Sequence, residues 1–578
     1  MLSDLNSLSV FMKGKYAMLG IGVCILVVMA YVIRPFFVAP GYVDESYQAL
    51  CVVQWKTSPV AMFLFWQGHL WTVLFGDSYL SLRMLSALIT VSSFTVSCGY
   101  LGFRTGSWRD AVWMFALCGS LGLIEAHLMY NWDVAPALLY SLCAILSVEY
   151  AYRGRLWVLC LLAVTVCLVG LSRIQLCILF PVYLFYVWRI GSESRVKLKL
   201  SNLRAVIFAV VYLLAFGAVS SLMCGSPIDY IQAFASQNII TGHSLYNLGS
   251  FISIPMFFLG MSTSQQFVGI WVVLVAVIYT AASIQNQKNV RITVLLVSII
   301  IMVGIVMSLF MYCDAGLECG FGSTGLSLMT TVLFLPVVGN VLRGGTDKHG
   351  TNRTLILCII WLWFVVPSLG SDNFMAHFNA YGLLPIAVAV IVNDLTAHQK
   401  SFLRNLLFFA MVAFGIIAGF RTCNIIANSD QLLDMVPKMQ GLHVNKGDKQ
   451  KILEVCNVTT VLDSIGCGDK VHFDGERYLF TYTLQKAPVY DLHSFHPLDR
   501  EHEINRRKSV AGEYDAWLFL DVTNEDIAGV DSMLVYEGFV CVGNRIWLDL
   551  NPDTTARKGM ILFLREPFAS RYRAITGK

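Results

Sequence analysis

The sequence predicts a polytopic α-helical membrane protein that carries a soluble α/β domain at its C-terminus. Of its 578 residues, 56% are hydrophobic and 13% are charged, and the mean hydropathy is +0.64. Soluble globular chains contain about 25% charged residues, so this composition places most of the chain in lipid. The net charge of +4 is small and is spread over several loops, which gives no support to nucleic-acid binding.

About 13 apolar runs are long enough to cross the roughly 30 Å of membrane hydrocarbon. The first run, 16–37, follows Lys13 and Lys15 and has no convincing cleavage site after it. We therefore expect it to be retained as a span and not removed as a signal peptide. The stretch 251–261 is either a further span or a helix in the membrane interface. The other expected spans are 81–103, 111–129, 133–151, 156–171, 174–189, 205–223, 267–284, 292–312, 326–342, 354–369, 381–395 and 405–421.

The distribution of lysine and arginine predicts the orientation, because cytoplasmic loops hold most of these residues. With the N-terminus in the cytoplasm, the basic residues gather in the cytoplasmic loops, whereas the outer segments 225–249, 313–325 and 370–380 contain none. An odd number of spans then places the C-terminus outside. We expect a multi-pass protein of the cell (inner or plasma) membrane. The basic residues concerned are Arg104, Arg109, Arg153, Arg155, those within 189–204, Lys288, Arg291, those within 343–353, Lys400 and Arg404.

The chain divides into a membrane domain, 1–421, and an extracytoplasmic domain, 422–578. The membrane domain includes a long first outer loop, 38–80, in which we expect interfacial helices. After residue 421 charged residues become frequent and no run could cross a membrane, and the tail is long enough to fold independently. Expected strands are Ala516–Val522, 532–542 and 560–564, and expected helices are 430–440 and 523–531. The order of the strands cannot be derived from the sequence.

Two adjacent carboxylates, Asp44 and Glu45, follow the first span and lie at the outer membrane surface. One interpretation is that they stabilise the N-terminus of an interfacial helix, where negative charge is favoured. The other is that they form a catalytic site. The spacing alone gives the two interpretations similar weight.

A string of residues in this region resembles the N-terminal signature of the GT-C glycosyltransferases, and more narrowly that of the protein O-mannosyltransferases and aminoarabinose transferases, which use polyprenyl-phosphate sugars. The resemblance implies a GT-C type membrane domain and a catalytic role for Asp44, with Glu45 as its neighbour or substitute. The string spans about 45 residues, in the family's order. It consists of Asp44-Glu45, Tyr47, Ser58-Pro59, Phe75-Gly76-x-Ser78, Leu82-Arg83 and Leu85-Ser86-Ala87-Leu88.

Weaker parts of the resemblance concern three further outer segments. Asp133 lies where the family has a polar turn that opens a span, although helix capping also explains this residue. Arg173 lies where the family often has a lysine, and it could bind a phosphate or snorkel to headgroups. His377 and Tyr381 lie in the family's late outer loop, although a histidine in such a loop is more often simply solvated.

The resemblance implies transfer of a sugar from a polyprenyl-phosphate-linked donor to an acceptor hydroxyl on the extracytoplasmic face, with inversion. Asp44 would be the base. Arg83 and Arg173 would neutralise the departing phosphate, and four residues would line the substrate cavity: Tyr47, Asp133, His377 and Tyr381. We expect no cofactor; a divalent ion bound by carboxylates is possible but not favoured. The sugar remains open, as does the acceptor, which could be a lipid, a polysaccharide or a protein.

Two other functions stay open. A multi-span transporter or lipid flippase would use the outer acids to steer its substrate, and a non-catalytic assembly factor would use the outer domain to bind a partner. Four outer cysteines also leave alternatives, because an oxidising compartment permits disulfides. They would form two pairs, Cys313 with Cys319 and Cys456 with Cys467, or remain free thiols.

Overall fold

The computed structural model describes residues 15–38, 44–55, 61–125, 129–131, 134–193, 198–232, 348–365, 381–392, 397–468, 470–474, 477–484, 511–522, 534–546 and 559–577. Ten of the 13 expected spans fall wholly or partly within these ranges, and each contains a helix. The expected spans 267–284, 292–312 and 326–342 and the stretch 251–261 lie outside them. The helices are α2 (Lys15–Ile33), α5 (Tyr79–Thr105), α6 (Trp108–Glu125), α7 (Ala137–Arg153), α8 (Leu156–Ser172), α9 (Leu179–Glu193), α10 (Leu198–Cys224), α16 (Lys348–Val365), α17 (Leu383–Ile391) and α18 (Ala397–Asn428).

Length and apolarity fit membrane spans in this part of the chain. Among the described residues, four stretches are long and apolar enough to cross a bilayer: Met18–Phe36, Tyr79–Thr105, Leu200–Cys224 and Leu403–Asn428. Two shorter apolar helices accompany them, Leu156–Ser172 and Leu176–Ile190. The chain is therefore a polytopic helical membrane protein, and the total number of spans remains a prediction.

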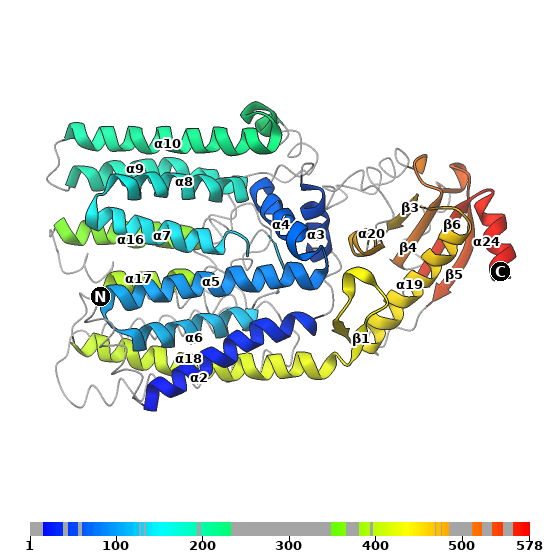
Figure 1. Cartoon of the computed structure of the whole chain (residues 1–578), viewed down its shortest axis with the longest axis horizontal. Helices are drawn as coiled ribbons and strands as arrows, with labels where there is room; N and C mark the ends of the chain where they lie inside the picture. Colours follow the sequence, from blue (N-terminus) through cyan, green and yellow to red (C-terminus); the bar gives the residue numbers. More distant parts are fainter. Residues whose placement is uncertain are drawn as a thin grey trace, which may run out of the picture.

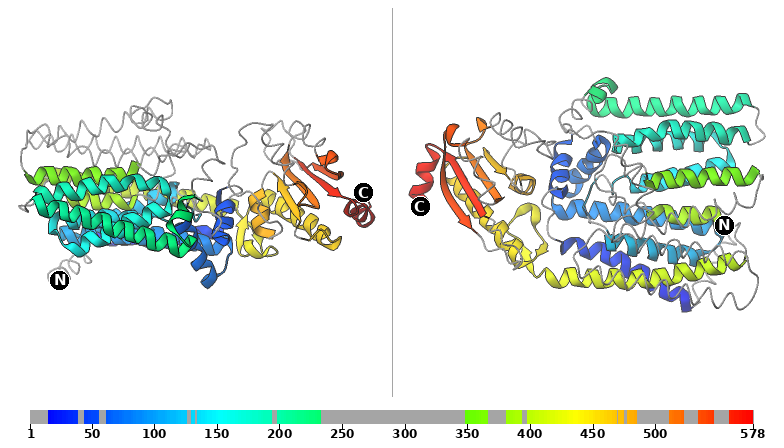
Figure 2. Two further views of the ribbon diagram at one scale, coloured as in Figure 1. Left: turned by 90° about the horizontal axis from the view of Figure 1, so that it is seen from above. Right: turned by 180° about the vertical axis from the view of Figure 1, so that it is seen from behind.

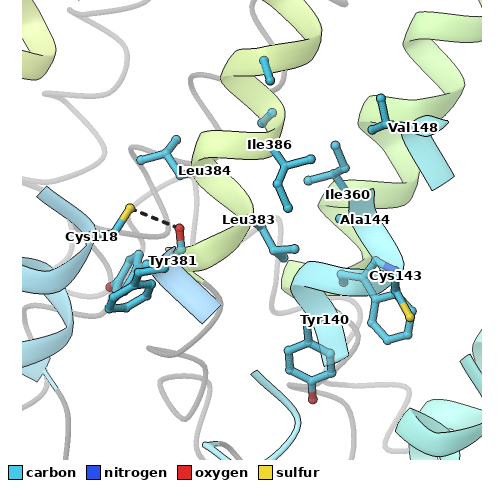
Figure 3. Packing of buried hydrophobic residues seen from close by; sticks show 14 of the residues in the cluster. Cys118, Tyr140, Cys143, Ala144, Val148, Ile360, Tyr381, Leu383, Leu384 and Ile386 are labelled. Carbon is cyan, nitrogen blue, oxygen red and sulfur yellow. Dashed lines mark hydrogen bonds between the residues drawn. The ribbon is translucent and has the colours of Figure 1, made fainter. Parts of the chain in front are cut away.

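The membrane helices lie side by side in one bundle, and the C-terminal domain lies beyond one end of it (Figures 1 and 2). Helix α17 is central, since every residue from Tyr381 to Ile391 is buried. It packs against α5 and α7, and side chains of α7 and α16 surround it (Figure 3). Gly382 permits this approach, because a Cβ there would lie 2.5 Å from Ser93 Oγ and 2.7 Å from Ser141 Oγ.

The basic loops described in the structure meet at the end of the bundle away from the C-terminal domain. There, Arg404 at the start of α18 lies 3.2 Å from Asp110 at the start of α6, Nε to Oδ1. At the same end, Glu149 of α7 lies 4.0 Å from Arg104 of α5 and 2.7 Å from Arg153. The concentration of basic residues in alternate loops thus corresponds to one physical face of the bundle.

Helix α18 leads directly into the C-terminal domain. It runs to Asn428, seven residues beyond the boundary that we expected at 421 and 422. A two-stranded antiparallel sheet follows, formed by β1 (Gln431–Leu433) and β2 (Leu442–Val444), with the 3-10 helix η8 (Pro437–Met439) between the strands. Next come α19 (Lys446–Ser464), β3 (Val471–Asp474), α20 (Arg477–Leu484), β4 (Ala516–Val522), β5 (Phe539–Ile546), β6 (Gly559–Arg565) and α24 (Phe568–Thr576).

The main sheet of this domain has the strand order β3-β4-β6-β5. Strands β3 and β4 are parallel, and the other two pairs are antiparallel. The expected strand Ala516–Val522 is β4, and the expected strand 560–564 lies within β6. The expected strand 532–542 overlaps β5, which begins only at Phe539. An α/β domain is therefore present, as the sequence indicates.

The expected helix 430–440 is wrong. Its first residues form β1, and the short η8 follows. Pro437 explains the difference, since a residue that precedes proline is driven out of the α conformation, and Val436 is extended with φ −109° and ψ 110°. Helix α19, which the sequence analysis did not predict, begins directly after β2, where the Asn445 side chain accepts a hydrogen bond from Asp448 N at 2.8 Å.

Candidate active site

Two short helices of the long loop that follows α2 lie at the end of the bundle that faces the C-terminal domain (Figure 1). They are α3 (Asp44–Val53) and α4 (Met62–Phe75). Asp44 is the first residue of α3, a position where a carboxylate is favoured by the helix dipole. Buried residues of α3, from Glu45 to Val52, pack the helix against its surroundings. The structure thus places both residues of the acidic pair in the first turn of α3.

Glu45 is bound by Arg83 from the first turns of α5. Arg83 Nε donates to Glu45 Oε1 at 2.6 Å, and Arg83 Nη2 donates to Oε2 at 2.7 Å. The side chains are 1% and 8% exposed, respectively. This two-pronged geometry is the strongest form of a carboxylate–guanidinium pair.

The same guanidinium also holds the end of the first span. Arg83 Nη1 donates to Pro35 O at 2.9 Å and to Val38 O at 2.7 Å. Pro35 belongs to the 3-10 helix η1 (Arg34–Phe36) that ends the span. Arg83 therefore connects three segments, and its geometry fits a role in positioning Glu45. Direct binding of a phosphate by Arg83, which the sequence analysis predicted, stays a prediction.

A second link joins α3 to α5. The Ser46 Oγ and Tyr79 Oη atoms lie 2.8 Å apart, and Tyr79 is fully buried. At the same turn, Ser78 caps α5 by accepting a hydrogen bond from Ser81 N at 3.1 Å. Because both α3 contacts come from the start of α5, the N-terminus of α3 has little freedom to move relative to the bundle.

Helix α4 lies close to α3 and exposes an apolar end. A Cβ at Gly68 would lie 2.7 Å from Val52 and 2.8 Å from Tyr130, so only glycine permits this close packing. The Trp71 indole donates to Ser81 O at 2.9 Å. The last residues of α4 are large and exposed, namely Leu70, Val73, Leu74 and Phe75. An aromatic, apolar helix end of this kind suits the membrane interface.

Arg173 lies at the C-terminal end of α8, in the turn that leads into the 3-10 helix η4 (Ile174–Ile178). It is 6% exposed, and its backbone is held by hydrogen bonds from Arg173 N to Val169 O and from Leu176 N to Arg173 O. Helix α4 packs against α8. Arg173 is therefore a buried cation, and a buried charge is costly unless it is paired.

The other predicted site residues divide into two groups. Tyr47 and Tyr381 are 3% and 1% exposed and lie in packed apolar clusters. The Tyr381 carbonyl accepts a hydrogen bond from Cys118 Sγ at 3.3 Å (Figure 3). Asp133 and His377 lie outside the described residues. Substrate contact by these four residues stays a prediction.

Two arginines that the sequence analysis did not select bind the C-terminal end of α6. Arg34 Nη1 donates to Leu123 O and Arg421 Nη1 donates to Ile124 O. These neighbouring carbonyls lie at the negative end of the α6 dipole. One helix end therefore binds an arginine from the end of the first span and an arginine from α18. In sequence, Arg34 and Arg421 look like ordinary cations near span ends, and only the packing of the three helices distinguishes them.

The described part of the chain contains no group of three or more His, Cys, Asp or Glu side chains able to hold a metal ion. Since Asp133 and His377 lie outside it, the expected absence of a metal remains a prediction. Cys456 and Cys467 are free thiols, and burial raises the pKa of Cys456 to about 11 and of Cys467 to about 12. Cys313 and Cys319 lie outside the described residues.

Comparison with known proteins gives structural matches only, because no family model and no curated protein matches the sequence. The chain is similar to ArnT from Cupriavidus metallidurans in the apo state, at 14% identity and a TM-score of 0.40, over 95% of this chain and 97% of that one. It is also similar to the oligosaccharyltransferase AglB from Archaeoglobus fulgidus in complex with an inhibitory peptide and a dolichol-phosphate. In that match the identity is 11% and the TM-score 0.43, over 93% of this chain and 74% of that one.

Proposed function

We propose that the protein is a glycosyltransferase that moves a sugar from a polyprenyl-phosphate-linked donor to an acceptor hydroxyl on the extracytoplasmic face, with Asp44 as the base. One observation carries the proposal: Glu45 is buried and held by the Arg83 fork, directly after Asp44 at the first position of α3. We therefore assign a structural role to Glu45 and the role of base to Asp44.

The reaction needs a base and a cation that stabilises the departing phosphate. It needs no nucleotide, since the phosphate ester already activates the sugar. Asp44 accepts the acceptor hydroxyl proton as that oxygen attacks the anomeric carbon. The bond from the anomeric carbon to the phosphate oxygen breaks, and its electron pair leaves with the polyprenyl phosphate. A single displacement of this kind inverts the anomeric centre, and proton transfer to a positioned base contributes about 10²–10⁴-fold to such rates.

Arg173, a buried residue at the end of α8, is a candidate for the cation that faces the departing phosphate. Arg83 donates two hydrogen bonds to Glu45 and two to backbone carbonyls, and these bonds fix the site. Arginine is suited to phosphate because its planar fork matches two phosphate oxygens. The exposed apolar end of α4 would receive part of the isoprenoid tail.

The proposed orientation places the N-terminus in the cytoplasm and the C-terminal domain outside. It is supported by the basic end of the bundle, where Arg404 pairs with Asp110 and Arg104 lies near Glu149, because basic loops favour the cytoplasmic side. Helices α3 and α4 lie at the opposite end (Figure 2). The carboxylate pair would then face the extracytoplasmic space, where lipid-linked sugars are presented to outer acceptors.

The test is sugar transfer from a synthetic polyprenyl-phosphate donor by the full chain in proteoliposomes. We expect Asp44→Asn to lower kcat by about 10²–10⁴-fold while the protein inserts and unfolds as the wild type does. Asp434→Asn, the same change at an exposed position of the C-terminal domain, is the matched control and should keep full activity. Undiminished transfer by correctly inserted Asp44→Asn would exclude Asp44 as the base, and donor movement across the bilayer without transfer would indicate a flippase.

A further inference from the structure

A buried lysine of the C-terminal domain forms an ion pair with the turn between α4 and α5. Lys438 of η8 lies with its Nζ 2.5 Å from Asp77 Oδ2. The lysine side chain is only 6% exposed, whereas that of Asp77 is 43% exposed. A buried ammonium group is costly unless it is paired, so this contact defines one position of the domain relative to the bundle.

Tyr482 of α20 holds the same turn. Its hydroxyl donates to Asp77 O, and Lys438 Nζ lies 4.2 Å from the centre of its ring, a cation–π distance. Burial raises the pKa of Tyr482 well above its usual value, so the hydroxyl stays protonated and remains a donor at neutral pH. Lys438, Tyr482 and Asp77 thus form one interlocked contact, which we call the domain latch.

The domain latch continues inward to the helix that carries the proposed base. The Tyr482 ring meets the Tyr79 ring edge-to-face, with centroids 5.0 Å apart. The Tyr79 hydroxyl lies 2.8 Å from Ser46 Oγ, and Ser46 follows Glu45 in the first turn of α3. Helix α20 also packs directly on α3. A continuous set of buried contacts therefore connects the C-terminal domain with the N-terminus of α3.

The apolar packing follows the same path. One buried cluster combines residues of α3, α4 and the start of α5 with residues of the C-terminal domain, among them Tyr47, Leu50, Leu433, Met439 and Leu479. A second contact lies beside it, where Ser429 Oγ donates to Phe37 O at 2.7 Å. Since the α3 helix shares its core with the outer domain, displacement of that domain would disturb α3.

The position of α3 matters for catalysis, because a reacting group is effective only within a narrow range of positions. A displacement of about 1 Å at a reacting group can cost on the order of 10²-fold in rate. Sites therefore need supporting residues that lock the catalytic group in place. Around the N-terminus of α3, this support comes from Arg83 of the bundle and, through Tyr79, from Tyr482 of the C-terminal domain.

We propose that Lys438 and Tyr482 are positioning residues, and that the C-terminal domain holds the N-terminus of α3 in the geometry needed for catalysis. The domain is then a part of the catalytic apparatus, and it does more than select acceptors. This inference rests on the proposed function, because it assigns the domain latch to the same site as Asp44.

Lys438→Met tests the inference, because methionine keeps an apolar chain over Tyr482 and removes the charge. Lys446→Met, at an exposed lysine of the same domain, is the matched control. We expect Lys438→Met to lower both sugar transfer and acceptor-free hydrolysis of the donor by about tenfold or more, with the acceptor KM unchanged. Lys438→Arg, which keeps the charge, should restore part of both rates, and Lys446→Met should match the wild type.

Acceptor-free hydrolysis separates positioning from acceptor binding, because water replaces the acceptor in that reaction. A raised acceptor KM with unchanged hydrolysis would overturn the inference and make the domain latch part of an acceptor site. Unchanged rates would also overturn it.

Hydrogen–deuterium exchange of residues 44–53 gives a readout that does not depend on activity. We expect faster exchange there in Lys438→Met than in Lys446→Met. Equal exchange in the two variants would refute the positioning role, whatever the activity shows. A wild-type protein that neither transfers nor hydrolyses the sugar would instead refute the proposed function, and the exchange result would still decide the coupling.

Discussion

Replacement of Arg83 by methionine should be among the most destabilising single changes at the outer end of the bundle. Arg83 donates four hydrogen bonds, two to Glu45 and two to the carbonyls of Pro35 and Val38. Its side chain is 1% exposed. Methionine fills most of the same volume, so the loss is mainly electrostatic.

The expected loss of stability is set by Glu45, which stays buried without Arg83 as its partner. Removal of one partner of a buried ion pair costs about 3–5 kcal/mol, because the other charge stays buried without compensation. The two carbonyls add about 1–3 kcal/mol each if they find no other donor. We therefore expect a loss of about 3–5 kcal/mol where water satisfies the carbonyls, and a larger loss where they stay unpaired.

The assay is thermal unfolding of the purified full chain in nanodiscs, followed by tryptophan fluorescence, together with sugar transfer. Glu45→Gln combined with Arg83→Met should be more stable than Arg83→Met alone, because the double variant buries no unpaired charge. Both Arg83→Met proteins should also lose transfer activity, since α3 loses its anchor. An unchanged unfolding midpoint in Arg83→Met, or simple addition of the two single effects, would refute the assignment of Arg83 as the partner of Glu45.

Two further predictions concern the packed core and the buried thiols. Gly382→Ala should destabilise the protein by about 1–3 kcal/mol, because its Cβ would lie 2.5 Å from Ser93 Oγ and 2.7 Å from Ser141 Oγ. Gly217→Ala is the matched control, since a Cβ there would have nothing within 4 Å. Equal unfolding midpoints of the two variants would contradict this packing. Cys467 should resist a maleimide reagent at pH 8, because burial raises its pKa to about 12 and the reactive thiolate forms only as the pH approaches that value. Mass-spectrometric labelling of the folded protein measures this, and labelling of Cys467 at pH 8 as fast as that of a free thiol in solution would contradict it.

Much of the membrane domain could be predicted because its elements are specified locally. A run of apolar residues partitions into lipid according to its own length and composition, and each expected span within the described residues contains a helix. Strands β4 and β6 were also predicted closely, since their apolar and β-branched residues are bounded by polar ones. The segment 430–440 was misjudged because its apolar spacing outweighed the effect of Pro437 on the residue before it.

The pairings at the candidate site could not be predicted in the same way. Arg83 and Glu45 are 38 positions apart, and Lys438 and Asp77 are 361 positions apart. The pair Leu82-Arg83 marks Arg83 in the sequence but does not show that its partner is Glu45, and no motif marks Arg34, which binds the end of α6. For both arginines, the packing of the helices determines which acceptor the side chain meets.

The sequence by itself determined the class of protein, the location of most spans and the carboxylate pair that begins α3, because partition into lipid and helix-terminal preference act over a few residues. Tertiary structure alone decided that Arg83 pairs with Glu45 and that the C-terminal domain packs against α3. The physical reason is that a buried charge must find its partner in three dimensions. For Glu45 and Asp77 the partners come from elements that meet only after the bundle and the C-terminal domain have assembled.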